Sequence, residues 1–209
     1  MTEAEWLTSD DPNKLLVSFP LPTQRKTQLF ACACCHQIKH LLTDKGLRAI
    51  AGTERAIDGL LPLAELFELQ PDMSARYGSS LDADSAVSWA LRDGQQDPSG
   101  YLPGYLYAAQ WSASASRDAP AQWRIQADLV RDIFANSFRP VNFATAWLTS
   151  DVLALARQMY ESREFSAMPI LADALQDAGC DNPDVLNHCR GDGPHVRGCW
   201  VVDLVLGKE

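Results

Sequence analysis

The sequence predicts an all-α protein, a single-domain multi-helix bundle that spans residues 1–209. Helix start signals recur from Thr2 into the last third of the chain, and apolar residues recur every three or four positions. The alternating runs that are typical of half-buried strands are almost absent. We therefore expect at least half of the chain to be helical, with no sheet larger than a hairpin.

Three helices are predicted near the N-terminus. Thr2 and Glu5 have the spacing of a capping box, in which each side chain bonds the other's backbone. Residues 11–12 place an N-cap aspartate before a proline, the residue that best tolerates the first helical position. Thr23 can cap the longest run, 24–43, whose apolar residues lie on one face.

The middle of the chain is predicted to be less regular. Gly46 is expected to interrupt the helical pattern. Proline and glycine residues then punctuate a looser region at about 71–103. Shorter helical patterns cover roughly 47–57, 61–69, 83–91, 104–111 and 119–134.

The last third is predicted to be helical again, over about 152–160, 166–178 and 182–189. Gly179 follows the second of these helices as a C′ glycine. The final segment has helical spacing, but a short β element at 200–206 is the alternative because this run is rich in valine.

Composition bears on the compartment and the partners. With a formal charge of −9 and a pI near 4.9, the surface as a whole should repel the phosphates of nucleic acid, so we do not expect it to bind nucleic acid. No apolar run is long enough to cross a membrane, and the first residues are acidic where a signal peptide is basic. We therefore predict a cytoplasmic protein whose six cysteines stay reduced, without a native disulfide.

All six cysteines and all four histidines lie in two windows, 32–40 and 180–199, which hold 29 of the 209 residues. Thiolate and imidazole are preferred zinc ligands. In one long helix the first window would present a stripe of three such side chains, and the second window could complete the site. The candidate metal ligands are Cys32, Cys35, His36, His40, His188, Cys189, His195 and Cys199.

An interpretation without metal remains open, because none of these spacings matches a known zinc finger or knuckle. The cysteines would then fill the core as small apolar side chains. The cofactor is accordingly zinc or none. In both cases we expect the two windows to meet, with the long helix packed on the segment 188–200.

The glycine-rich loop at 190–198 is a candidate anion site. It places Arg190 and Arg197 near an expected helix N-terminus, where backbone amides and guanidinium groups can hold a phosphate or carboxylate. The alternative is a tight connection in which the glycines serve the backbone and the arginines pair structurally.

Several segments resemble an uncharacterised paralogous family that is abundant in planctomycete-type genomes. The matching residues are TEAEWL at 2–7, LFACACC at 29–35 with His40, RDIF at 131–134, FRPV at 138–141, LADAL at 171–175, AGC at 178–180, HCR at 188–190 and HVRGCW at 195–200. The resemblance leaves about 60–120 uncovered and implies no activity, cofactor or catalytic residue. In that family the position of His36 is often arginine, which implies a ligand set of Cys32, Cys35 or His40 with the C-terminal window.

The sequence leaves three functional hypotheses. It contains no nucleophile elbow, phosphate-binding loop, zinc-protease motif or dinucleotide fingerprint, so the first is a non-enzymatic helical module that binds another protein. The alternative is a zinc-binding protein, with a structural or hydrolytic metal held by residues from 32–40 and 188–199. The third, which the net charge favours least, is nucleic-acid association through Arg25, Lys26, Lys39, Arg190 and Arg197.

Overall fold

The protein has the predicted all-α fold. The computed structural model describes residues 1–18, 23–69, 79–91, 104–116 and 118–208, and about 70% of this part of the chain is helical, with no strand in it. In chain order the helices are α1 (Glu3–Thr8), α2 (Pro12–Leu16), α3 (Gln24–Gln37), η1 (Lys39–Leu41), α4 (Asp44–Ile57), α5 (Leu63–Glu68), α6 (Ser79–Leu91), α7 (Gly104–Ala115), α8 (Ala119–Phe134), η2 (Thr145–Trp147), α9 (Ser150–Ser162), α10 (Met168–Asp177), α11 (Pro183–Arg190) and α12 (Trp200–Leu206).

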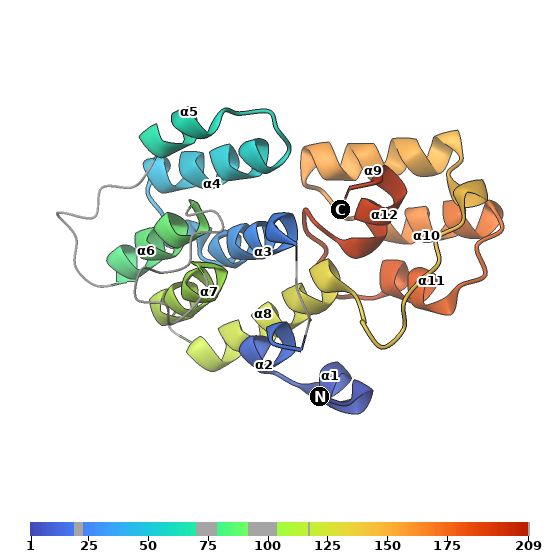
Figure 1. Cartoon of the computed structure of the whole chain (residues 1–209), viewed down its shortest axis with the longest axis horizontal. Helices are drawn as coiled ribbons and strands as arrows, with labels where there is room; N and C mark the ends of the chain where they lie inside the picture. Colours follow the sequence, from blue (N-terminus) through green and yellow to red (C-terminus); the bar gives the residue numbers. More distant parts are fainter. Residues whose placement is uncertain (19–22, 70–78, 92–103, 117, 209) are drawn as a thin grey trace.

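The helices form two lobes that lie side by side (Figure 1). In the first, α3 runs through the centre and packs against α4, α6, α7 and α8. The second contains α9 to α12, and one apolar cluster of buried side chains between 152 and 205 forms its core. Two further clusters, on opposite sides of α3, form the core of the first lobe. Helix α8 contacts α12 and so links the lobes.

The cysteines of α3 divide between these clusters. Cys32 and Cys35 belong to one cluster and Cys34 to the other, and all three are buried. Burial raises the pKa of each thiol, because a thiolate would lose its hydration there. They therefore act as apolar side chains of the core.

All six cysteines are free thiols. We therefore expect a thiol titration of the unfolded, unreduced protein, in denaturant with a chelator, to find six reactive thiols per chain. The same titration after reduction is the control, since it gives the total. A count of four or two before reduction would contradict the prediction.

The predicted long helix at 24–43 was wrong only beyond Gln37. Helix α3 ends at Gln37, a 3₁₀ turn follows, and Thr43 caps α4 by accepting a hydrogen bond from the amide of Gly46. Gly46 thus lies in the first turn of α4 and interrupts nothing. A Cβ there would come within 3.0 Å of Oδ1 of Asp84, so the glycine permits close packing of α4 on α6.

The alternative of a short β element at 200–206 was also wrong, since this segment is α12. Its valines at 201, 202 and 205 are buried in the core of the second lobe, and the described residues offer no strand with which it could pair. Gly207, with φ of 62°, ends the helix in the left-handed conformation that glycine adopts readily.

Part of the predicted looser region, 70–78 and 92–103, lies outside the described residues, and 79–91 between these parts forms α6. Among the described residues, no helix combines the length and apolar character that crossing a membrane would require.

Candidate metal centre

Four potential metal ligands meet between α8 and the C-terminal segment. Asp132 lies on the last full turn of α8, His188 on α11, His195 in the loop that follows, and Cys199 at the N-cap of α12. Their ligand atoms all lie within 4.8 Å of one another. We call this group the DHHC cluster.

The loop of the DHHC cluster is held close to the first lobe by a glycine. Gly198 has φ of 100°, a conformation that residues with a side chain rarely adopt. A Cβ at this position would lie 3.2 Å from Cβ of Leu29 on α3 and 3.7 Å from Cγ1 of Ile133 on α8. Glycine therefore lets the loop between His195 and Cys199 lie directly on α3 and α8.

The distances within the cluster are close to those of a tetrahedral site. Oδ1 of Asp132 lies 2.9 Å from Nδ1 of His195 and 3.2 Å from Nε2 of His188. Sγ of Cys199 lies 3.3 Å from Nε2 of His188 and 4.0 Å from Nδ1 of His195. Zinc bonds of about 2.0–2.3 Å require about 3.3–3.8 Å between tetrahedral ligand atoms, so the shortest pair would have to open and pairs of up to 4.8 Å would have to close by about 1 Å to accommodate the ion.

The cluster is enclosed. Asp132 and Cys199 are buried, and the side chains of His195 and His188 are 8% and 19% exposed. The ring of His188 packs 5.0 Å from that of Trp200, centroid to centroid. The second carboxylate oxygen of Asp132 accepts a hydrogen bond of 3.0 Å from the amide of Val196, which orients the carboxylate toward the histidines.

The electrostatics of the cluster favour a cation. Burial alone would raise the pKa of Asp132, but hydrogen bonds with His188 and His195 outweigh it and hold this pKa below its usual value. Burial, and secondarily the negative charge of Asp132, raise the pKa of the Cys199 thiol well above its ordinary value. A metal ion would relieve both conditions, since it neutralises the carboxylate and displaces the thiol proton.

The structure brings together three of the eight sequence-predicted metal ligands, His188, His195 and Cys199. Cys189 is buried in the same apolar core but is not a member of the cluster. Its pKa is raised to about 12 by burial.

The other four predicted ligands lie elsewhere, so the expected contribution of 32–40 to a shared site was wrong. Cys32 and Cys35 are in the core of the first lobe, and His40 is exposed on the 3₁₀ turn. His36 binds Glu54, with 3.0 Å between Nε2 and Oε1. Helix α3 packs on the loop at Gly198 through Leu29, which precedes the first window. Residues of both windows line one cleft, but their sulfur and nitrogen atoms share no centre.

The two arginines of the predicted anion site pair with side chains. Arg190 donates hydrogen bonds to Asp173 and Gln176 on α10. Arg197 lies 3.1 Å from Oδ2 of Asp58, and its guanidinium stacks over the ring of Tyr160. The two side chains therefore bind different parts of the protein and form no common anion site in the loop.

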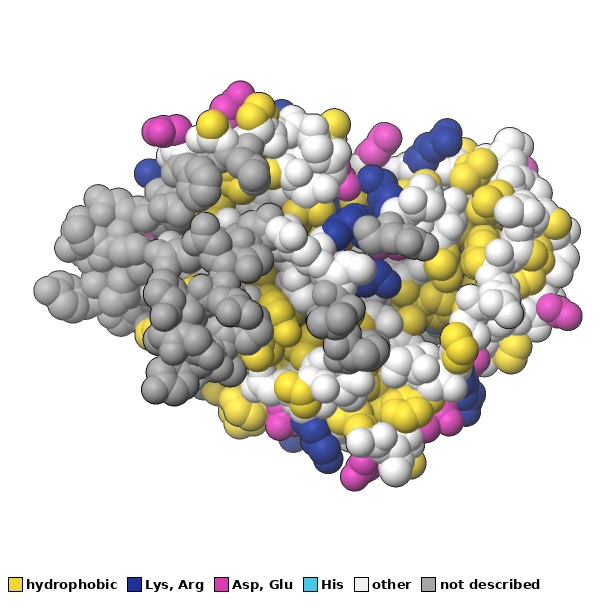
Figure 2. Space-filling view, in the orientation of Figure 1, with side chains coloured by type: hydrophobic (Ala, Val, Ile, Leu, Met, Phe, Trp, Pro, Cys, Tyr) yellow, Lys and Arg dark blue, Asp and Glu magenta, His cyan; other side chains and the backbone are white. Residues whose placement is uncertain are grey.

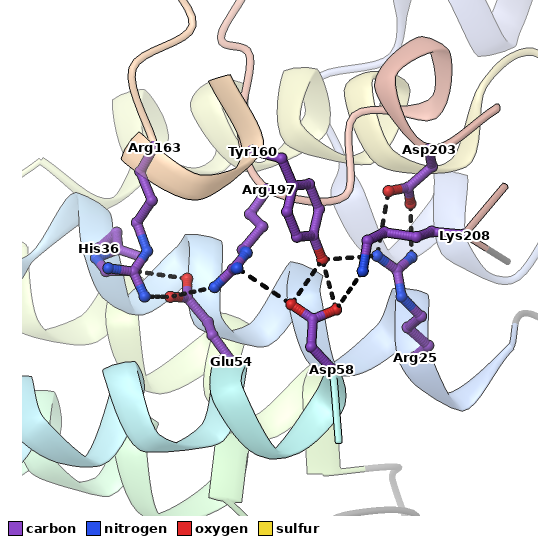
Figure 3. A network of polar contacts seen from close by, with 9 residues as sticks. All are labelled: Arg25, His36, Glu54, Asp58, Tyr160, Arg163, Arg197, Asp203 and Lys208. Atoms are coloured by element: carbon purple, nitrogen blue, oxygen red, sulfur yellow. Dashed lines mark hydrogen bonds and ion pairs between the residues drawn. The ribbon is translucent and has the colours of Figure 1, made fainter. Parts of the chain in front are cut away.

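Arg197 belongs to a network of charged side chains between the lobes (Figure 3). Glu54 and Asp58, from the last turns of α4, face cations that come from the second lobe. The network consists of Arg25, His36, Glu54, Asp58, Tyr160, Arg163, Arg197, Asp203 and Lys208. Arg25 and Arg197 are thus engaged by carboxylates, which weakens the hypothesis of a nucleic-acid surface built on them.

Sequence reasoning missed Asp132 as a candidate ligand. A signal exists, because the residue lies between Leu129 and Ile133 on the buried face of an amphipathic helix, where an ionisable side chain requires a partner.

No protein-family model matches the chain, and comparison with curated proteins and with solved structures likewise gives no match. The resemblance to a planctomycete-type family therefore stays a prediction, and the function is argued from the site itself.

Proposed function

We propose that the protein binds one zinc ion at the DHHC cluster, as a structural metal that fixes the C-terminal lobe to α8. The observation that carries this proposal is the convergence of Asp132, His188, His195 and Cys199 within 4.8 Å. Mixed oxygen, nitrogen and sulfur ligands suit zinc better than the oxygen-preferring magnesium or calcium ions.

The ligand count supports a structural metal. Four protein ligands complete the tetrahedron, whereas catalytic zinc sites keep one position open for water or substrate. The burial of Asp132 and Cys199 also limits the access of a substrate to the cluster. A hydrolytic zinc would need one of these ligands to dissociate.

The fold explains what a metal would do there. Asp132 belongs to the first lobe, while the other three ligands come from the second lobe and its loop. Zinc would therefore join Asp132 to ligands that lie at least 56 residues further along the chain. It would also reinforce the contact of α8 with α12. The role of a non-enzymatic module that binds another protein remains a prediction and is compatible with such a site.

Elemental analysis tests the proposal. We expect about one zinc per chain in protein purified without a metal-affinity tag and dialysed against buffer without metal, because four ligands in a closed site release zinc slowly. The same measurement after unfolding in chelator and refolding gives the background. Protein that neither retains zinc nor takes it up on addition of one equivalent would refute the proposal.

A further inference from the structure

A cleft of about 570 Å³ lies between the lobes, next to the DHHC cluster. One wall comes from α3 and the turn after it, with His36 and Lys39, and the other from the end of α9, with Arg163. Glu54 and the loop residues His195 to Arg197 also line it. A separate group of Lys and Arg side chains gathers between the two lobes near α12, as the space-filling view shows (Figure 2).

The cleft contains a buried donor that lacks an acceptor. Nε of Arg197 is buried and has no hydrogen-bond partner. Nε2 of His195 is unpaired as well, but Nδ1 of this ring donates to the carboxylate of Asp132, which leaves Nε2 of the neutral ring an acceptor. Nη1 of Arg197 is 3.8 Å from Oε2 of Glu54, too far for a hydrogen bond. A buried donor without an acceptor is costly, and each such group in a folded protein requires an explanation.

The charges that line the cleft also favour an anionic ligand. Two carboxylates line the cleft: Glu164 is exposed, and the buried Glu54 is shared between His36, Arg163 and Arg197. Lys39 is exposed at the rim, and the described residues give it no ion pair. Three cations, Lys39, Arg163 and Arg197, thus face two carboxylates, so the cleft has a small excess of positive charge in a chain whose formal net charge is −9.

We propose that this cleft binds a small oxyanion, a molecule that carries a phosphate or carboxylate group, between Lys39, Arg163 and Arg197. An oxygen of the anion supplies the acceptor that Nε of Arg197 lacks, and guanidinium groups bind such oxygens in a planar, two-point geometry. The side chain of Arg163 is 40% exposed and that of Arg197 is 11% exposed, so the site has an open rim and a buried inner end. This site is separate from the zinc ligands except for His195, which lines both.

Calorimetric titration of the full-length protein tests the proposal, with inorganic phosphate in one arm and succinate in the other at constant ionic strength. We expect one saturable site for at least one of the two anions, and the tighter arm identifies the chemical class. Lys39→Gln should weaken that binding about tenfold, the effect of about 1.4 kcal/mol from one charge-assisted contact.

Lys14→Gln is the matched control, because it makes the same charge change at a side chain 51% exposed that pairs with Glu5 outside the cleft. It should alter the affinity less than twofold. Since Lys39 is exposed and forms no ion pair with the described residues, its replacement should leave the fold intact, which circular dichroism verifies. Absence of saturable binding of both anions in the millimolar range, or equal weakening by the two variants, would overturn the proposal.

Discussion

Cys199→Ala is expected to remove most of the stabilisation that the proposed zinc ion would give to the protein. A ligand that binds only the folded state stabilises it by about 2.7 kcal/mol when its concentration is 100 times its dissociation constant. For a chain of 209 residues this corresponds to a rise in melting temperature of about 5–11 °C. Without the thiolate the site has three ligands, and most of this rise should disappear.

Cys189→Ala provides the matched control. Both cysteines are 0% exposed and lie in the same apolar core, so their replacement by alanine creates similar small cavities. Only Cys199 belongs to the DHHC cluster. Thermal unfolding with zinc and with chelator should therefore differ for the wild type and Cys189→Ala, but hardly for Cys199→Ala. An unchanged zinc effect in Cys199→Ala would remove the thiolate from the ligand set.

The helical fold could be predicted because its signals are local. Capping residues such as Thr2, Asp11 and Thr23 act within one turn, and each caps the helix that the sequence predicts. The error at 24–43 arose where tertiary packing decides the outcome. The close approach of Gly46 to Asp84 on α6 is a long-range contact that no local pattern contains. The same holds for the valines of α12, whose burial outweighs their preference for strands.

The site could be predicted only in part, for a related reason. The gathering of cysteine and histidine at 188–199 indicates possible ligands, and three of them do converge. The fourth ligand, Asp132, comes from a distant helix, and its residue type is too common on helices to stand out by composition. Conversely, the predicted stripe of Cys32, His36 and His40 required one continuous helix, which ends at Gln37.

The network between the lobes could not be foreseen from sequence, since its members are distributed from Arg25 to Lys208. Its acidic members are nevertheless strongly shielded from water: Glu54 has a side chain only 3% exposed and Asp58 one of 5%. The phenolic hydroxyl of Tyr160 donates a 2.7 Å hydrogen bond to Asp58, and burial with this bond raises the pKa of Tyr160 to about 12. The ion pairs thus fix how the two lobes dock on each other more specifically than apolar contacts alone would.

Glu54→Gln is expected to lower the free energy of unfolding by about 2–3 kcal/mol at pH 7. Breaking a fully buried ion pair costs about 3–5 kcal/mol because the partner charge stays desolvated. Here the side chains of His36 and Arg163 are 36% and 40% exposed, so water can solvate them and the cost is smaller. The buried Arg197 keeps Asp58 as its second partner.

The effect of Glu54→Gln on stability should depend on pH, whereas the effect of a simple packing defect would not. Burial would raise the pKa of Glu54, but the hydrogen bond and charge of His36, followed by the charges of Arg163 and Arg197, lower it below 4.5. Since the folded pKa is depressed below this ordinary value of 4.5, the carboxylate contributes its full stabilisation above the ordinary value and loses it as the pH falls through the folded pKa.

Urea unfolding of the wild type and Glu54→Gln should therefore show a large difference in stability at pH 7 that shrinks below about pH 4.5. Glu161→Gln, an exposed glutamate on α9, is the control and should change the free energy of unfolding by less than about 0.5 kcal/mol. A difference between the wild type and Glu54→Gln that is the same at both pH values would mean that amide packing, and not the lost charge, destabilises the variant. In that case the charged network would not be what holds the two lobes together at this position.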